Sequence, residues 1–333
     1  MNIIDFLENN VRNDPNKIAI ISEGKNTSYK ELDEQVQKIC LVISALNNQD
    51  IISLISENSI SFVTAYLGII KAGKIVHIVP SNISEINLLN QIKSAGSQLI
   101  ICSKSVFGSI SRYSKINIPI LQFSELKITS TSKNKVFKKN EITHLIYTSG
   151  TTFDPKGVGI THSMLEFTTK NIVDVLGYSN SDIDVLPLPL YHSFGLGCFY
   201  TSISVGATLI LHKDTSNLDN VLDSFKKFNA TTVAVLPATL TKLLKFDNKE
   251  LRDYFSDIRL VITNSTAIPK NTILSFKEIL KNGKLATYYG LTEASRSTFM
   301  IFQKDSVNDE SVGKPAPGVN IKIMNDSNSE GEI

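Results

Sequence analysis

The sequence has few cysteines, no concentrated positive charge and no metal-ligand motif. Its three cysteines, Cys40, Cys102 and Cys198, are far apart and lack the spacing of a structural metal site. Isolated cysteines in odd number are typical of buried thiols in a reducing compartment. The 34 Lys and Arg residues nearly balance 32 Asp and Glu residues, and the lysines are spread along the chain. This balance gives no basis for nucleic acid as a partner.

The sequence also lacks the features of a signal peptide and of a membrane helix. Asp5 and Glu8 lie where a signal peptide would have its apolar core. The longest apolar stretch, residues 186–211, contains His192 with several glycines and serines, and it therefore fits buried strands and turns better than a membrane span. We expect a cytoplasmic protein that has neither a membrane span nor a nucleic-acid partner.

Short apolar segments alternate with longer amphipathic segments along most of the chain. Ile51–Ile55 precedes a helical pattern over Ser59–Ala72, and Lys74–Val79 follows it. After a linker near residues 127–141, rich in Lys, Ser, Thr and Asn, further strand-like segments are His144–Tyr147, Asp184–Pro187, Ala207–His212, Thr231–Leu236 and Arg259–Thr263. Such alternation indicates an α/β fold in which helices cover a mostly parallel sheet.

The last fifteen or so residues have the pattern of an incomplete hairpin. Val319–Ile323 alternates like a strand with one wet face, Asn325–Ser329 is typical of a turn, and Gly331–Ile333 resembles the start of a returning strand. A chain that stopped there would leave an unpaired edge. We therefore expect the sequence to be a piece of a longer protein.

A hydroxyl-rich segment predicts a phosphate site. Residues 147–157 read Tyr-Thr-Ser-Gly-Thr-Thr-Phe-Asp-Pro-Lys-Gly and follow an apolar strand-like run. Hydroxyls and backbone N–H groups in such a turn can bind a phosphate chain, and a lysine adds a point charge. The phosphate-binding candidates are Thr148, Ser149, Gly150, Thr151, Thr152 and Lys156. The segment is not a Walker loop, and the simpler alternative is a polar loop that ends in a Pro-Lys-Gly turn.

A second segment, Tyr288–Glu293, reads Tyr-Tyr-Gly-Leu-Thr-Glu and lies about 140 residues downstream of the first. Mg²⁺ in proteins is held by one or two carboxylates together with phosphate oxygens, and Glu293 could supply such a carboxylate. Taken alone, the segment could equally be a strand end followed by a turn. Its pairing with the hydroxyl-rich segment favours a shared nucleotide site.

Together the two segments resemble the signature motifs of the adenylate-forming (ANL) superfamily, which contains acyl-CoA synthetases, peptide-synthetase adenylation domains and firefly luciferase. The resemblance covers nearly the whole chain, but Phe153 replaces a glycine that is usual in the family's phosphate loop. It implies ATP and Mg²⁺ as cofactors, with Glu293 and Thr148 as metal ligands. It also implies that Thr292 contacts the α-phosphate and that the ring of Tyr289 stacks on adenine.

Two further segments align with the family's adenine turn and acyl pocket. The turn at Asn264–Thr266 follows a strand-like run and has no glycine where the family is glycine-rich, and an ordinary strand-to-helix turn is the alternative. The adenine or AMP set implied is Asn264, Ser265, Thr266, Tyr288, Tyr289, Gly290 and Thr292. Leu186–Gly197 resembles the acyl-pocket segment, which implies that His192, Phe194 and Gly195 line that pocket. The catalytic set implied is His192, Thr292, Glu293 and Lys156.

The acyl-pocket segment also bears on the substrate. Amino-acid-activating domains usually have Phe-Asp where this chain has Tyr191 and His192. Without that carboxylate, an α-ammonium group would be uncompensated in an apolar pocket. We therefore expect a small-molecule carboxylic acid of acyl or aryl type as substrate. The resemblance implies CoA or a phosphopantetheinyl carrier protein as acceptor, with an acyl or peptidyl carrier protein as a candidate partner.

The resemblance further implies an acid–thiol ligase built from two helix-covered sheet subdomains and a partial small β-barrel. Residues 1–45 with 185–295 would form one subdomain, residues 46–184 the other, and residues 296–333 the partial barrel. The family's mobile C-terminal domain, which bears a catalytic lysine, would be absent, so we expect low activity from this chain alone. Three rival functions remain: a non-catalytic nucleotide- or acyl-binding module, a kinase or P-loop ATPase, and an amino-acid-activating domain.

Overall fold

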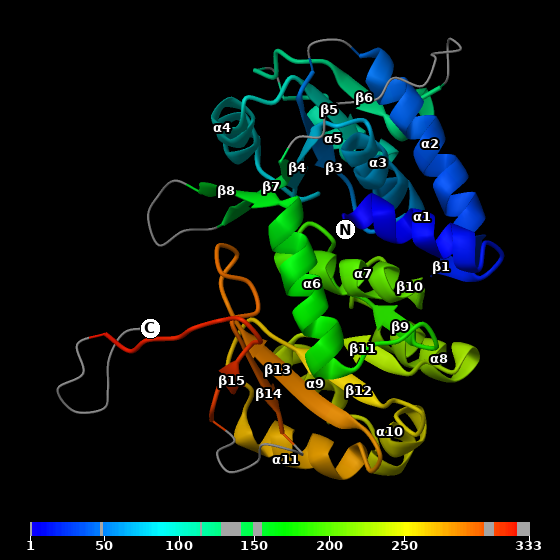
Figure 1. The fold of residues 1–333 in the computed structure, drawn as a ribbon, viewed down its shortest axis with the longest axis vertical. Helices are drawn as coiled ribbons and strands as arrows, with labels where there is room; N and C mark the ends of the chain where they lie inside the picture. The colour runs from blue at the N-terminus through cyan, green and yellow to red at the C-terminus, as the bar shows by residue number, and fades with distance from the viewer. Residues whose placement is uncertain are drawn as a thin grey trace.

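The computed structural model describes residues 2–46, 49–113, 115–127, 141–148, 155–302 and 310–324. Two mostly parallel sheets with helices packed against them make up the structure (Figure 1), which confirms the α/β class expected from the alternating pattern. Several predicted elements are confirmed closely, including the helix over Ser59–Ala72, which is α3 (Ile60–Lys71).

The six-stranded sheet has the order β6–β5–β3–β4–β7–β8. Its strands are β3 (Ile51–Ile55), β4 (Ile75–Val79), β5 (Leu99–Cys102), β6 (Ile120–Gln122), β7 (Ile142–Thr148) and β8 (Lys156–Thr161). All its neighbouring strands are parallel except the β7–β8 pair. The helices that follow its strands are α3, α4 (Glu85–Ala95) and α5 (Lys104–Ile110), and α2 (Tyr29–Ala45) packs on α3. Because helices shield the central strands, β3, β4 and β5 are apolar along nearly their whole length.

The nine-stranded sheet has the order β15–β14–β13–β12–β11–β9–β10–β1–β2. Its strands are β1 (Ile18–Ser22), β2 (Lys25–Ser28), β9 (Ile183–Leu186), β10 (Thr208–Leu211), β11 (Thr232–Ala234), β12 (Leu260–Thr263), β13 (Lys284–Tyr289), β14 (Thr298–Ile301) and β15 (Lys314–Pro315). Its helices are α1 (Ile3–Asn13), α7 (Ser193–Val205), α8 (Leu218–Phe228), α9 (Pro237–Leu243), α10 (Asn248–Tyr254) and α11 (Lys270–Ile279). The chain's N-terminal strand β1 pairs in parallel with β10, so distant segments complete one sheet.

The described part of the chain's end adds strands to the nine-stranded sheet, and the partial barrel expected over residues 296–333 stays a prediction. Strand β14 pairs antiparallel with β13, and β15 pairs antiparallel with β14, so both extend the nine-stranded sheet, and the described residues form no closed barrel. The predicted strand Val319–Ile323 was wrong: in the described residues only Met324 makes an isolated bridge. Alternation alone cannot make a strand without a partner, and the expected partner, Gly331–Ile333, lies outside the described residues.

The two sheets share one hydrophobic core and are joined by polar ties. Ile52 and Tyr66 from the six-stranded side belong to the same buried cluster as Leu209 from the other sheet. Helix α6 (His162–Leu176) follows β8 and packs on α7 at the junction (Figure 1). The side chain of Asn58, after β3, donates to the carbonyls of Leu188 (2.7 Å) and His212 (3.0 Å) and accepts from Leu190 N (2.8 Å). This tie fixes the loop that leads into α7.

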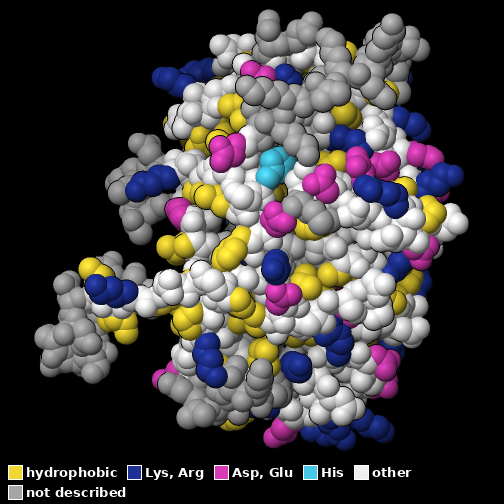
Figure 2. All heavy atoms as spheres, in the orientation of Figure 1, with side chains coloured by type: hydrophobic (Ala, Val, Ile, Leu, Met, Phe, Trp, Pro, Cys, Tyr) yellow, Lys and Arg dark blue, Asp and Glu magenta, His cyan; other side chains and the backbone are white. Residues whose placement is uncertain are grey.

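The strands divide between the two sheets according to their position in the chain. Strands within residues 51–161 build one sheet, and strands within 18–28 and 183–315 build the other. The subdomain limits at residues 45, 184 and 295 stay a prediction. No helix in the described ranges combines the length and apolar character that crossing a bilayer requires. Figure 2 shows acidic and basic side chains interspersed over the visible face.

Candidate functional site

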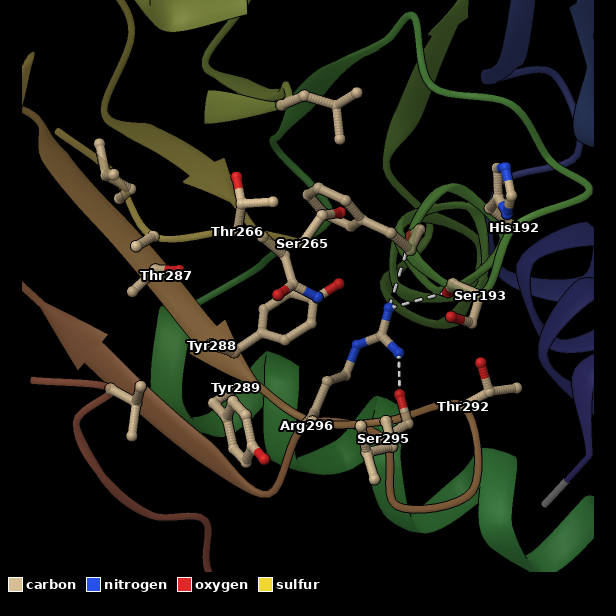
Figure 3. Close-up of a pocket in the computed structure, with 18 of the residues that line it drawn as sticks. His192, Ser193, Ser265, Thr266, Thr287, Tyr288, Tyr289, Thr292, Ser295 and Arg296 are labelled. Atoms are coloured by element: carbon tan, nitrogen blue, oxygen red, sulfur yellow. Dashed lines mark hydrogen bonds between the residues drawn. The ribbon is translucent and has the colours of Figure 1, made fainter. Parts of the chain in front are cut away.

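A cleft of about 1420 Å³ lies between the β7–β8 hairpin and the loops that follow β9, β12 and β13 (Figure 3 shows part of its lining). Every predicted site residue that the structure describes lines this cleft: Thr148, Lys156, His192, Phe194, Gly195, Asn264, Ser265, Thr266, Tyr288, Tyr289, Gly290, Thr292 and Glu293. The predicted phosphate ligands Ser149, Gly150, Thr151 and Thr152 lie outside the described residues. The fold thus brings together motifs that are far apart in the sequence, while the role of each residue stays a prediction.

The β7–β8 hairpin supplies the hydroxyl and the lysine. Thr148 ends β7 and Lys156 begins β8, and these two residues are direct partners in the antiparallel ladder. A Cβ at the neighbouring Gly157 would come within 2.9 Å of Cζ in the ring of Tyr147, so a larger residue there would displace that ring. That ring in turn packs edge-on against His77, with the ring centroids 5.1 Å apart. In the Lys-Gly pair, Lys156 places a positive charge at the cleft, and Gly157 packs closely against Tyr147.

Both tyrosines at the end of β13 line the cleft, but they differ in exposure. Successive residues of a strand point to opposite faces, so Tyr289 is 38% exposed whereas Tyr288 is 5% exposed. The ring of Tyr288 packs edge-on against Phe194 at 5.4 Å and tilted against Phe299 at 6.0 Å. The exposed ring of Tyr289 is available for a flat partner such as a nucleobase. Tyr288 forms the wall behind it (Figure 3).

The turn after β12 has an unusual backbone. Ser265 has φ = 97°, a left-handed value that glycine adopts without cost and serine rarely does. The sequence has no glycine in this turn, where the related family is glycine-rich. The left-handed backbone therefore falls on a serine. Strained residues of this kind cluster at binding sites.

The loop after β13 carries the acidic residue. The backbones of Leu291 and Ala294 exchange hydrogen bonds of 3.1 and 3.2 Å, which closes a tight turn that holds Thr292 and Glu293. Gly290 is sterically required, because a Cβ there would lie 2.5 Å from Arg296 N and 2.7 Å from Ala294 O. The carboxylate of Glu293 is exposed. Among the described residues no group of three or more His, Cys, Asp or Glu side chains could hold a metal by itself. A single exposed carboxylate such as that of Glu293 is the kind of ligand that Mg²⁺ combines with phosphate oxygens.

His192 lies directly before α7 and is exposed to the cleft. Its ring packs on Tyr191 with the centroids 4.7 Å apart. Partial burial lowers the pKa of His192 by disfavouring the charged form. A neutral imidazole can donate one hydrogen bond and accept another, which suits a contact to a carboxylate without a fixed ion pair.

A second, smaller cavity of about 280 Å³ adjoins the cleft. It shares Ser193, Thr292, Glu293, Ser295 and Arg296 with the cleft and is otherwise lined mainly by apolar side chains of β7, β8, α6 and α7, including Ile146, Ile160, Met164, Leu165, Phe167 and Leu196. The predicted acyl-pocket residues Phe194 and Gly195 line the larger cleft, and this cavity begins with the next helical residues, Leu196 and Gly197.

The sequence had not indicated the α6 residues or Arg296. Residues of α6 were missed because they carry no chemical motif and only packing brings them to the site. Arg296 follows the recognised Glu293 by three residues, and a charged residue in an otherwise small-residue loop was the signal available.

Comparison with known proteins gives relatives that extend beyond the chain. The chain is 23% identical to surfactin synthase subunit 2 of Bacillus subtilis over 97% of its own length and 9% of the length of that protein. It is 24% identical to acyl-CoA synthetase 7 of Caenorhabditis elegans over 93% of its own length and 63% of that protein's. The chain thus spans less than two thirds of both relatives.

Solved structures share the fold. O-succinylbenzoate coenzyme A synthetase (MenE) of Bacillus subtilis, in complex with ATP and magnesium ion, matches with a TM-score of 0.85 at 23% identity, covering 96% of this chain and 67% of that one. VinN matches with a TM-score of 0.85 at 23% identity, covering 98% and 84%. Residues 7–333 match the family described as AMP-binding enzyme. With its motifs gathered at one cleft and nearly its whole length matched, the chain belongs to the AMP-binding enzyme family.

Proposed function

We propose that the protein activates a carboxylic acid by adenylation. The observation that carries the proposal is the convergence of Thr148 and Lys156 from one sheet with Tyr289 and Glu293 from the other at a single cleft. An ATP molecule needs a flat partner for its base, positive and hydroxyl groups for its phosphates, and a carboxylate for the accompanying Mg²⁺. The cleft offers all three.

The proposed reaction joins the acid to AMP. An oxygen of the substrate carboxylate attacks the α-phosphorus of ATP, a P–O bond to the bridging oxygen breaks, and pyrophosphate leaves with that electron pair. Both reactants are anions, so positioning and charge neutralisation have to supply most of the rate enhancement. When bound, Mg²⁺ would neutralise phosphate charge.

Each of the cleft residues has a proposed role that follows from its position. Glu293 would hold Mg²⁺ with assistance from Thr148, and Lys156 would bind the phosphate chain. Thr292 would contact the α-phosphate, and neutral His192 would donate a hydrogen bond to the substrate carboxylate. Tyr289 would stack on adenine beside the Asn264–Thr266 turn.

The names of the relatives support a thiol as the second substrate. An acyl-CoA synthetase and a coenzyme A synthetase are among the proteins that resemble this chain. We infer that coenzyme A accepts the acyl group in the full-length protein, and a carrier-protein thiol is the second candidate because surfactin synthase is also a relative.

Isotope exchange tests the proposal. The full-length protein should exchange labelled pyrophosphate into ATP when a suitable acid is present, and AMP should be the nucleotide product. Exchange driven by amino acids alone would assign an amino-acid-activating domain, and ADP as product would assign a kinase. ATP binding without exchange for any acid would overturn catalysis in favour of a binding module.

A further inference from the structure

Arg296 lies in the wall between the cleft and the smaller cavity and lines both. Its side chain is 5% exposed and extends toward the start of α7 (Figure 3). Nη2 donates to the carbonyls of Ser193 (3.2 Å) and Phe194 (3.5 Å), and Nη1 donates to Ser295 Oγ (2.5 Å). Its guanidinium also lies over the ring of Tyr288, 4.8 Å from the centroid.

In the described part of the chain Arg296 forms no ion pair with a carboxylate, although Glu293 lines the same two cavities. All its hydrogen-bond acceptors are neutral, and Nε is buried without an acceptor there. Arg259, by comparison, forms an ion pair with Asp182. A buried guanidinium without a carboxylate is costly, because water has been removed and nothing negative replaces it.

The surrounding structure accommodates this side chain at some cost. Gly197 lies inside α7, where glycine disfavours a helix, yet any Cβ there would overlap the guanidinium. Arg296 itself has φ = 60°, a left-handed value that a non-glycine residue adopts rarely. Strain of this kind is retained where the side chain serves a site.

We propose that Arg296 binds a second carboxylate of the acid substrate, so that the protein activates a dicarboxylic acid. The inference rests on the adenylation proposed above. The planar guanidinium matches a carboxylate in shape and charge, and the apolar lining of the smaller cavity takes the carbon skeleton. The reacting carboxylate is a poor partner for Arg296, because it loses its charge on forming the adenylate, and a fixed ion pair would stabilise the ground state more than the transition state.

Matched acids test the proposal directly. Succinate and butyrate, adipate and hexanoate, and terephthalate and benzoate are pairs that differ by one carboxylate. In pyrophosphate exchange by the full-length protein, one diacid should exceed its monoacid in kcat/KM by about 100-fold, the range expected for a buried charge pair. Calorimetric titration of the ATP-loaded protein with the same acids gives a readout that does not depend on turnover.

Variants separate recognition from folding. Arg296→Gln should lower kcat/KM for the diacid by about 100-fold, mainly through KM, and leave the monoacid within about threefold. Arg296→Lys should restore part of the diacid preference because it keeps the charge. Lys270→Gln is the matched control, since it removes a positive charge from the cleft but not from the smaller cavity, and it should leave the preference unchanged. Thermal unfolding verifies that each variant is folded.

The outcomes distinguish this inference from the proposed function. Exchange with monoacids equal to or better than their diacids would overturn the role of Arg296 and leave adenylation standing. An equal loss of ATP affinity in Arg296→Gln without any acid would also overturn it, since the arginine would then serve the nucleotide. If the protein shows no exchange but binds a diacid, and Arg296→Gln abolishes that binding, adenylation would be overturned while the recognition of a carboxylate by Arg296 would stand. Neither exchange nor diacid binding would overturn both.

Discussion

The two sheets meet at one cleft but bury different kinds of polar group. The six-stranded sheet buries two histidines, His77 and His144, whose Nδ1 atoms lie 2.9 Å from Ser53 Oγ and 3.0 Å from Tyr66 Oη. The nine-stranded sheet buries two carboxylates, Asp182 and Asp184. The sheet that carries the β7–β8 hairpin therefore buries side chains that burial keeps neutral, whereas the sheet that carries Tyr289 buries ionisable acids.

This difference gives the two sheets opposite responses to pH. Burial lowers the pKa of His77 to about 4 and of His144 to about 3, from 6.5. As pH falls from about 6.5 toward 4, the unfolded chain takes up protons that the folded histidines refuse, and stability is lost. Burial raises the pKa of Asp184 from 3.8 to about 6, against hydrogen bonds from Thr232 and Ser202. The loss of stability caused by burying the ionised carboxylate of Asp184 is therefore absent below about pH 4 and complete above about pH 6.

Glu293→Gln on the nine-stranded side should have the largest effect on activity. Loss of the carboxylate removes the proposed Mg²⁺ ligand, and removing one preorganised electrostatic group costs roughly 10²–10³-fold in rate. Pyrophosphate exchange measures the loss, and the exposed Glu278→Gln on α11 serves as control. Retention of more than half the activity would exclude Glu293 as an essential Mg²⁺ ligand.

Lys156→Met on the six-stranded side should have a smaller effect. Lys156 is exposed at the start of β8, and one hydrogen bond to a charged group contributes about 1.5–3 kcal/mol, or roughly 10- to 150-fold. The change should appear chiefly in KM for ATP, with Lys249→Met on α10 as control. A loss larger than that of Glu293→Gln would reverse the comparison and make the hairpin the dominant side of the site.

Asp184→Asn should stabilise the protein at neutral pH. The rise of the Asp184 pKa from 3.8 to about 6 corresponds to about 3 kcal/mol of differential stability. We expect a gain of about 1–2 kcal/mol above pH 6, because Ser202 Oγ and Thr232 Oγ1, at 2.7 and 2.6 Å, must adapt to an amide. The gain should vanish below about pH 4, where the wild-type carboxyl is protonated in both states. Urea unfolding from pH 4 to 8 measures it.

The exposed Asp257→Asn is the control for that series. Its stability should follow the wild type across the range. A gain for Asp184→Asn that is the same at pH 4 and at pH 8 would show that packing, and not ionisation, sets the difference between the sheets.

How much the sequence could predict also differs between the sheets. The alternation predicted β3, β4 and the parallel arrangement, because shielded strands are continuous apolar runs. The cleft residues followed from two motifs, since phosphate and metal contacts need particular side chains. The α6 lining carries no motif and could not be predicted, and the sequence showed only the position of Arg296 near Glu293, because its contacts depend on packing between segments over 100 residues apart, such as Arg296 with Ser193. The partial barrel over residues 296–333 stays a prediction, because much of that segment lies outside the described residues.

Ser265→Gly should have the smallest effect. It tests whether the backbone of the turn after β12 is strained at Ser265. Glycine relieves the left-handed φ of 97° at that position, and the gain of about 1 kcal/mol is partly offset by the greater freedom of glycine in the unfolded chain. We expect a net gain of about 0.5 kcal/mol in urea unfolding, whereas Ser256→Gly, exposed and without a positive φ, should lose a similar amount. If Ser265→Gly destabilises the protein as much as Ser256→Gly does, the turn is relaxed as it stands. Among the described residues that line the cleft, Arg296, with φ = 60°, would then be the non-glycine residue left with a strained left-handed backbone.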